Sequence, residues 1–203
     1  NNLLDFVDNG VLSEDMYKLI KGEALGLRAF CHLDLLRLYG PIPGKQTDKK
    51  ILSYAREVSR QNMPVNTWAE YIAFLEKDLN EAETLLEEIE KKGIDDDYFT
   101  YRQNRMNYWA VMAVKARFYL WIQNKEKAAE YAKKVIDGVG EQFKLSQPEN
   151  FTNKDYIASS EHLFSVHVYD LEDITETFIY RSGGVEQTKS LIVELFEGDV
   201  TDV

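Results

Sequence analysis

The residues best suited to metal binding or nucleophilic chemistry are few and widely separated. The sequence holds three histidines, His32, His162 and His167, and a single cysteine, Cys31. His162 and His167 are five residues apart, so on an extended strand their side chains face opposite sides and could not share a metal ion. Because Cys31 is the single cysteine of the sequence, an internal disulfide is excluded. Cys31 lies on the apolar face of an expected helix, so we predict a small buried side chain with no activating base.

Motifs that bind phosphate or carry out catalysis are missing from the sequence. There is no Gly-rich phosphate loop, no Gly-x-Ser-x-Gly elbow and no His-Glu-x-x-His zinc motif. The run Asp95-Asp96-Asp97 offers carboxylates for calcium, but it lacks the alternating ligands and the glycine of an EF-hand loop. We therefore predict no catalytic residue, no metal and no cofactor, and an enzyme is disfavoured.

Polar residues within one mostly apolar segment are expected to have structural roles. Arg28 needs buried hydrogen-bond acceptors there, so it is predicted to be a structural anchor. His32, close to Arg28, is predicted to be a core histidine with a hydrogen-bonded ring. Asp34 and Arg37 are three residues apart and can form an ion pair on one helix face.

Aromatic side chains remain as candidates for ligand binding. Exposed rings can stack on the apolar faces of sugar rings, while Asn, Asp and Arg bind hydroxyl groups. The same rings can equally pack under a loop, which is the more frequent role of a single aromatic residue. The candidates are Tyr98, Phe99 and Tyr101 in one loop, and Tyr169, Phe178 and Tyr180 near the end. The ligand-binding residues are therefore left unassigned.

Composition and charge exclude several classes of partner. The chain has 203 residues, of which 44% are hydrophobic and 29% charged, as in globular proteins. Its net charge is −11, whereas nucleic acids and anionic membranes attract clusters of Lys and Arg. The acidic residues concentrate in segments 76–97 and 161–203, which are predicted to be solvated faces. No apolar run reaches the roughly 20 residues of a membrane helix.

Hydrophobic periodicity predicts a long first helix at the centre of the fold. Ser13 begins this helix, and Gly40-Pro41 ends it after about Tyr39. From Ala24 onward the helix is apolar nearly all round, which is typical of a buried helix. Gly22, Gly26 and Ala29 place small residues on one side, so we expect a neighbouring helix to approach closely there.

Three further helices follow a connection over residues 41–66. The capping box Thr67-Trp68-Ala69-Glu70 begins the second helix, which ends at Lys91-Lys92-Gly93. Helices over about 105–123 and 125–137 are joined at Asn124 by so short a turn that they must form an antiparallel hairpin. Small and aromatic residues of this hairpin match the offsets of a tetratricopeptide repeat: Ala116, Tyr119, Ala128 and Ala132. We predict a mainly α fold of tetratricopeptide-like antiparallel helix pairs, an α-α superhelix.

The pattern changes after Gly140. Pro148 and Asn150 predict a loop, and alternating apolar residues predict a strand over about 161–169. A loop over 170–187 and a short helix over 188–196 are expected to follow. The predicted domains are a tetratricopeptide-like helical scaffold over 1–140 and a small irregular, β-containing region over 141–203 that continues beyond this excerpt.

Several segments, taken in order, resemble one known family. Residues 22–30 read Gly-Glu-Ala-Leu-Gly-Leu-Arg-Ala-Phe and continue into a corner at 36–43 that reads Leu-Arg-Leu-Tyr-Gly-Pro-Ile-Pro. Further matching segments lie at 67–82, 105–120, 127–136, 161–164 and 195–202. Together they resemble the SusD/RagB family of outer-membrane nutrient-binding lipoproteins over nearly the whole chain.

The resemblance implies a helical scaffold packed against a larger irregular region. It further implies a lipid-anchored protein on the cell-surface side of the outer membrane. Such a protein captures oligosaccharides or other nutrients and hands them to a SusC-like TonB-dependent transporter without catalysis. The matching residues are scaffold residues, so no ligand contact is carried over to this sequence.

The two ends of the sequence favour an excerpt of a longer protein. The chain begins at Asn1 without Met or a signal peptide, and Cys31, within a helix, cannot be the lipoprotein cysteine. We therefore expect membrane contact only through a lipid anchor outside this excerpt.

Two functions stay open at this point. The first is the glycan-binding component of a nutrient uptake complex, which rests on the ordered resemblance. The second is a generic helical-repeat adaptor that binds a protein or peptide in its concave groove, which rests on the hairpin at 105–137 alone.

Overall fold

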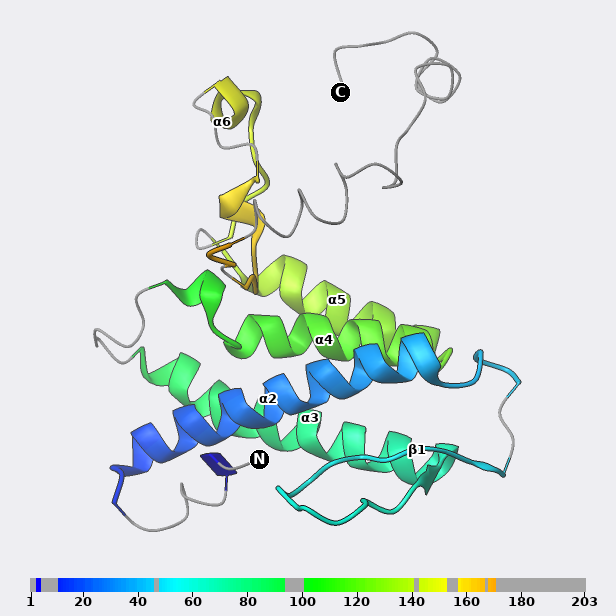
Figure 1. Ribbon diagram of the computed structural model, residues 1–203. Helices are drawn as coiled ribbons and strands as arrows, with labels where there is room; N and C mark the ends of the chain where they lie inside the picture. Colours follow the sequence, from blue (N-terminus) through cyan, green and yellow to red (C-terminus); the bar gives the residue numbers. More distant parts are fainter. Residues whose placement is uncertain are drawn as a thin grey trace, which may run out of the picture. The chain divides into compact units, whose positions relative to one another are not determined.

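A computed structural model describes residues 3–4, 11–45, 48–93, 101–140, 143–152, 157–166 and 168–170 (Figure 1). The chain divides into two units, Asn1–Ser165 and Val166–Val203, and the fold described below is that of the first. Its main helices are α2 (Glu14–Tyr39), α3 (Trp68–Lys92), α4 (Tyr108–Trp121) and α5 (Lys125–Gly138). The predicted mainly α fold of antiparallel helix pairs is confirmed.

Helix α2 has the two ends that the sequence predicts. The Ser13 hydroxyl accepts a hydrogen bond from the backbone N–H of Met16 at 3.4 Å, and Glu14 and Asp15 place negative charge in the first turn. At the other end the Gly40 N–H donates to the carbonyl of Leu36 at 2.9 Å. The helix therefore ends before Pro41, as expected.

Helices α2 and α3 form an antiparallel pair and lie side by side (Figure 1). The capping box of α3 is present, because the Thr67 N–H donates to Glu70 Oε2 at 2.8 Å and the Glu70 N–H donates to Thr67 Oγ1 at 3.4 Å. The ion pairs between the helices run Asp15–Lys92 at 2.5 Å, Lys18–Glu88 at 2.6 Å and Arg28–Asp78 at 2.6 Å. As the residue number of the α2 partner rises, the residue number of its α3 partner falls, so these ion pairs define the antiparallel register of the two helices.

The small residues of α2 allow close contacts on two sides. A Cβ atom added to Gly22 would lie 2.7 Å from Leu86 Cγ of α3. A Cβ atom added to Gly26 would lie 2.7 Å from Cγ of Met106, which precedes α4, and 3.0 Å from Cγ2 of Val111, which is in α4. The two distances of 2.7 Å are shorter than real Cβ contacts, so the predicted close approach at these glycines is confirmed.

The core lies among α2, α3 and α4. Each helix contributes fully buried apolar side chains, and the largest of these are Leu33 and Leu36 of α2, Tyr71, Leu75, Leu79 and Ile89 of α3, and Met112 and Phe118 of α4. In α3 the apolar residues that follow one another at steps of three or four are buried: Leu75, Leu79, Ala82, Leu86 and Ile89. Lys115 of α4 is also buried, and its ammonium group pairs with Glu83 and donates to Asn80 Oδ1 of α3 at 2.7 Å.

Helices α4 and α5 form the predicted hairpin, with a later start for α4. The Asn107 side chain caps α4 by accepting from the Ala110 N–H at 3.0 Å, and Arg105 is extended. The helix therefore begins at Tyr108 rather than at residue 105. Asn124 caps α5 by accepting from the Lys127 N–H at 3.1 Å. Tyr119 and Ala128 of the repeat signature are buried, and Tyr119 stacks on Tyr131 at 5.4 Å between ring centroids.

The connection between α2 and α3 holds a small antiparallel sheet. Strand β1 (Lys50–Leu52) pairs with β2 (Asn66–Thr67), with Lys50 opposite Thr67. Beyond β1, the Tyr54 N–H donates to Asn66 Oδ1 at 2.9 Å, and the Tyr54 side chain is buried against α2 and α3. The connection thus contributes one aromatic ring to the core.

Two predictions after residue 140 are wrong. Residues 148–150 were expected in a loop, but they begin the short helix α6 (Pro148–Thr152). The strand expected over 161–169 is absent from the described residues of that range: Glu161 ends the 3₁₀ helix η3 (Ser159–Glu161), and the described residues after it form no strand. This segment meets the 3₁₀ helix η2 (Arg102–Asn104) instead of a partner strand, and the Ser165 N–H donates to the Gln103 carbonyl at 2.7 Å. Apart from residue 170, the loop over 170–187 and the helix over 188–196 lie outside the described residues.

Substitution of Gly26 tests the close approach of α2 to α4. We expect Gly26→Ala to lower the free energy of unfolding by about 1 kcal/mol, because overpacking outweighs the gain in helix propensity. In a Met106→Ala background the same change should destabilise less than in the wild type, since the 2.7 Å contact with Met106 is removed and only the 3.0 Å contact with Val111 remains. Urea denaturation of the four proteins measures both effects. An increase in stability from Gly26→Ala alone would contradict the packing.

Candidate functional site

A buried polar cluster lies where α2, α3 and the connection meet. The Arg28 guanidinium donates to both carboxylate oxygens of Asp78, with Nε–Oδ2 at 2.6 Å and Nη2–Oδ1 at 2.7 Å. It also donates to the carbonyl of Arg56 at 3.1 Å, and the Tyr54 hydroxyl donates to Asp78 Oδ2 at 2.7 Å. Two-pronged pairing of this kind satisfies a buried charge. The predicted role of Arg28 as a structural anchor is confirmed.

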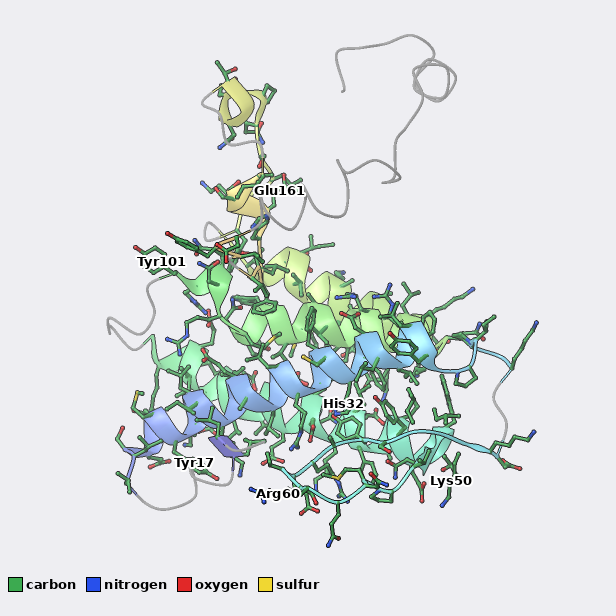
Figure 2. The ribbon with its side chains drawn as sticks, in the orientation of Figure 1. Tyr17, His32, Lys50, Arg60, Tyr101 and Glu161 are labelled. Carbon is green, nitrogen blue, oxygen red and sulfur yellow. The ribbon has the colours of Figure 1, made fainter. Side chains whose placement is uncertain are left out.

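His32 belongs to the same cluster and lies on α2 beside the connection (Figure 2). Its Nδ1 is 2.8 Å from the hydroxyl of Tyr71, and its ring stacks on Tyr54 at 4.0 Å between centroids. Burial lowers the pKa of His32, and it outweighs the backbone hydrogen bond at Ala55 and the charge of Asp78, which act the other way. The ring is therefore neutral at pH 7, as expected for a core histidine with a satisfied ring.

The electrostatics of this cluster suit structure rather than catalysis. Burial raises the pKa of both Tyr54 and Tyr71, and for Tyr54 the neighbouring Asp78 carboxylate raises it further. Both phenols therefore stay protonated at neutral pH and act as hydrogen-bond donors. Each is already engaged: Tyr54 donates to Asp78, and Tyr71 donates to the His32 carbonyl at 3.0 Å. The cluster fixes the position of the connection on the helix pair.

Cys31 is exposed, so the prediction of a buried thiol is wrong. Helix α2 is apolar on more faces than α3 and α4 can cover, and Cys31 lies on the face that they leave open. Leu27 and Leu35 on that face are 39% and 42% exposed. The open face forms part of a groove of about 580 Å³ lined mainly by Leu3, Ile20, Ala24, Leu27, Cys31 and Ala55. The expectation that α2 is buried all round is therefore wrong on this side.

The structure describes only some of the aromatic and histidine candidates. Tyr101 immediately precedes η2, is 73% exposed and has a left-handed backbone conformation, and Tyr169 is 91% exposed in the other unit. His162 is half-buried at the end of η3. The remaining candidates, Tyr98, Phe99, His167, Phe178 and Tyr180, lie outside the described residues, as does the acidic run at 95–97.

Sequence reasoning missed a pocket at the end of α2, which we call the corner pocket. It has a volume of about 310 Å³ and is lined by Arg37, Pro43, Arg117, Leu120, Trp121 and Gln123. The last turns of α2 and α4 and the loops that follow them meet there. The predicted Asp34–Arg37 pair is confirmed at 2.9 Å, but its place beside Arg117 could not be read from spacing within one helix. The corner sequence at 36–43 was the available signal.

Within the described ranges, no group of three or more His, Cys, Asp or Glu side chains could hold a metal ion. Among the described helices, none combines the length and the hydropathy needed to cross a bilayer.

The chain matches a family of carbohydrate-binding proteins. The model of a SusD-like family, described as starch-binding and associating with the outer membrane, matches residues 1–120. This range contains α2, α3 and nearly all of α4. No match was found among curated proteins.

Solved structures share the fold of this chain. A SusD superfamily protein from Bacteroides thetaiotaomicron is 23% identical with a TM-score of 0.65, over 85% of this chain and 37% of its own. A putative sugar binding protein from Bacteroides vulgatus is 23% identical with a TM-score of 0.63, over 80% of this chain and 36% of its own. NanU from B. fragilis is 20% identical with a TM-score of 0.60, over 87% of this chain and 35% of its own. The chain thus spans little more than a third of these structures.

Removal of one partner of the Arg28–Asp78 pair tests its structural role. The two side chains are 13% and 6% exposed, so Arg28→Ala should leave the Asp78 charge buried and lower the free energy of unfolding by about 3 kcal/mol. Asp34→Ala, which removes an exposed pair, should cost less than about 1 kcal/mol and serves as the control. Denaturant titration compares the two. Similar small losses in both variants would contradict a buried anchor.

The lowered pKa of His32 predicts a pH dependence of stability. Well above pH 6.5, the pKa of the ring in the unfolded chain, His32 is neutral in both the folded and the unfolded state, so it does not make the free energy of unfolding depend on pH. As the pH falls through 6.5, the unfolded chain takes up a proton that the folded ring resists, and the free energy of unfolding falls. His32→Gln should remove this component. The stability of the wild type relative to His32→Gln should therefore be constant above about pH 7.5 and decrease towards pH 5. A flat or rising difference would refute the buried neutral ring.

Proposed function

The chain belongs to the SusD-like family, and from this membership we propose that it acts as the surface-exposed glycan-binding component of a nutrient uptake complex. In this proposal it binds oligosaccharide and hands it to a SusC-like TonB-dependent transporter without catalysis. The protein is held on the cell-surface side of the outer membrane by a lipid anchor. The observation that carries the proposal is the family match over residues 1–120, whose description names starch binding and the outer membrane.

The arrangement of polar and aromatic side chains supports binding rather than turnover. Hydrogen bonds inside the core engage the cluster's groups that are suited to acid–base chemistry. They join His32 to Tyr71 and Tyr54 to Asp78. Tyr101 and Tyr169 expose their rings, as stacking on a sugar requires. We propose that residues 1–140 are the scaffold that contacts the transporter and that the region over 141–203 contributes aromatic rings to the ligand.

A helical-repeat adaptor is the second candidate function. It is favoured by the open apolar face of α2 around Leu27 and Leu35, because exposed apolar groups in a row mark surfaces that meet other proteins. The adaptor reading predicts a soluble protein or peptide ligand instead of a glycan.

A glycan array probed with the fluorescently labelled chain separates the two candidates. The proposal predicts binding to a restricted set of oligosaccharides, and cross-linking of the chain in outer membranes to a TonB-dependent transporter. The same chain unfolded by heat is the control for nonspecific retention. A blank array together with a cross-linked soluble protein would replace the proposal with the adaptor function.

A further inference from the structure

The corner pocket differs in charge from the rest of the molecule. Two of its lining residues, Arg37 and Arg117, are cations, and none of its lining residues is an acid. The whole chain carries a net charge of −11. A concentrated positive site on an acidic protein attracts an anionic group selectively, because the surrounding charge repels that group elsewhere.

Both arginines are held in place yet retain free donors. Arg37 Nη1 donates to Asp34 Oδ1 at 2.9 Å, and Arg117 Nη2 donates to the same oxygen at 3.3 Å. The Arg117 guanidinium also lies over the Phe30 ring, 5.7 Å from its centroid. One carboxylate thus faces two guanidiniums, which leaves one positive charge. Each guanidinium carries five N–H donors, and over the described residues neither has another hydrogen-bond acceptor.

The other lining residues suit the ring of a sugar. Trp121, Leu120 and Pro43 offer apolar surface, and the side chain of Gln123 offers an amide. The backbone of Gln123 is left-handed, with φ of 65°. The indole Nε1 of Trp121 is buried without a hydrogen-bond partner among the described residues. A buried unpaired donor costs free energy, which a small turn of the indole towards a hydroxyl oxygen in the pocket would recover.

We propose that the corner pocket binds the carboxylate-bearing ring of an acidic saccharide. Arg37 and Arg117 hold the carboxylate through charge-assisted hydrogen bonds, while the indole of Trp121 packs on the ring. The volume of about 310 Å³ lies at the lower end of the range for ligand pockets, so it suits one or two sugar units. The inference rests on the proposed glycan-binding function and adds the chemical class of the ligand. It also adds a ligand contact on the helical scaffold, in addition to the aromatic rings proposed for the region over 141–203.

Calorimetric titration of the chain with galacturonate and with galactose tests the charge recognition. The two sugars differ in the carboxylate, so galacturonate should bind at least about tenfold more tightly. Arg37→Gln and Arg117→Gln should each reduce that preference by about tenfold, with little change in melting temperature, because both arginines are nearly half exposed. Arg60→Gln is the matched control. It removes the same charge from the exposed connection, away from the end of α2 (Figure 2), and should leave both affinities unchanged.

The indole signals locate the bound sugar. The chain has three tryptophans, Trp68, Trp109 and Trp121, so a ¹H–¹⁵N spectrum shows three indole N–H signals. Galacturonate should shift the signal that disappears in Trp121→Phe and leave the other two in place.

Two outcomes would overturn the inference. If neutral oligosaccharides bind while galacturonate gains no advantage, or if its binding is unaffected in the Arg37 and Arg117 variants, the corner pocket is not an acidic-sugar site, although the glycan-binding function stands. If neither the glycan array nor the titration detects a sugar, the inference and the proposed function fail together.

Discussion

The two hydrogen bonds between Arg28 and Asp78 join the middle of α2 to the middle of α3 inside the protein. A guanidinium and a carboxylate that are both largely buried must meet, because separation would leave two unpaired charges in a region of low dielectric. The pair therefore fixes both the register and the rotation of the two helices. Tyr54 and His32 extend the cluster, so the connection between the helices is held to the same point.

The position of α2 determines which of its faces is left open and where the corner pocket forms. Gly22 and Gly26 let α3 and the start of α4 approach it, and this leaves the Cys31 face open. The same packing brings the last turn of α2 beside the last turn of α4, where Arg37 and Arg117 share the carboxylate of Asp34. The corner pocket is thus a consequence of helix packing far from it. Scaffold residues matched by the family and the residues proposed to bind ligand belong to the same helices.

Much of the helical part could be predicted from sequence because its signals are local. Ser13, the Thr67–Glu70 capping box and the turn at Asn124 each satisfy backbone groups within a few residues, so the helix ends were predicted closely. The strand predicted at 161–169 was wrong because a strand needs a partner, and its apolar alternation says nothing about the neighbour, which is η2. The burial of Cys31 was wrong for a related reason: periodicity indicates which faces are apolar but not how many neighbours cover them. The corner pocket was missed because it joins residues 37 and 117, which no spacing rule connects.

Native-state hydrogen exchange tests most directly the central claim that the α2–α3 pair is the element on which the structure depends. Because the buried residues concentrate in α2, α3 and α4, whereas Ala128 is the one residue of α5 that is buried, the amides of Ala29–Leu36, Leu75–Leu86 and Ala110–Tyr119 should exchange slowest, through global unfolding. Exchange in α5 should be faster, through local opening. If α2 exchanged before α5, with the Arg28–Asp78 segment opening first, the account would be contradicted.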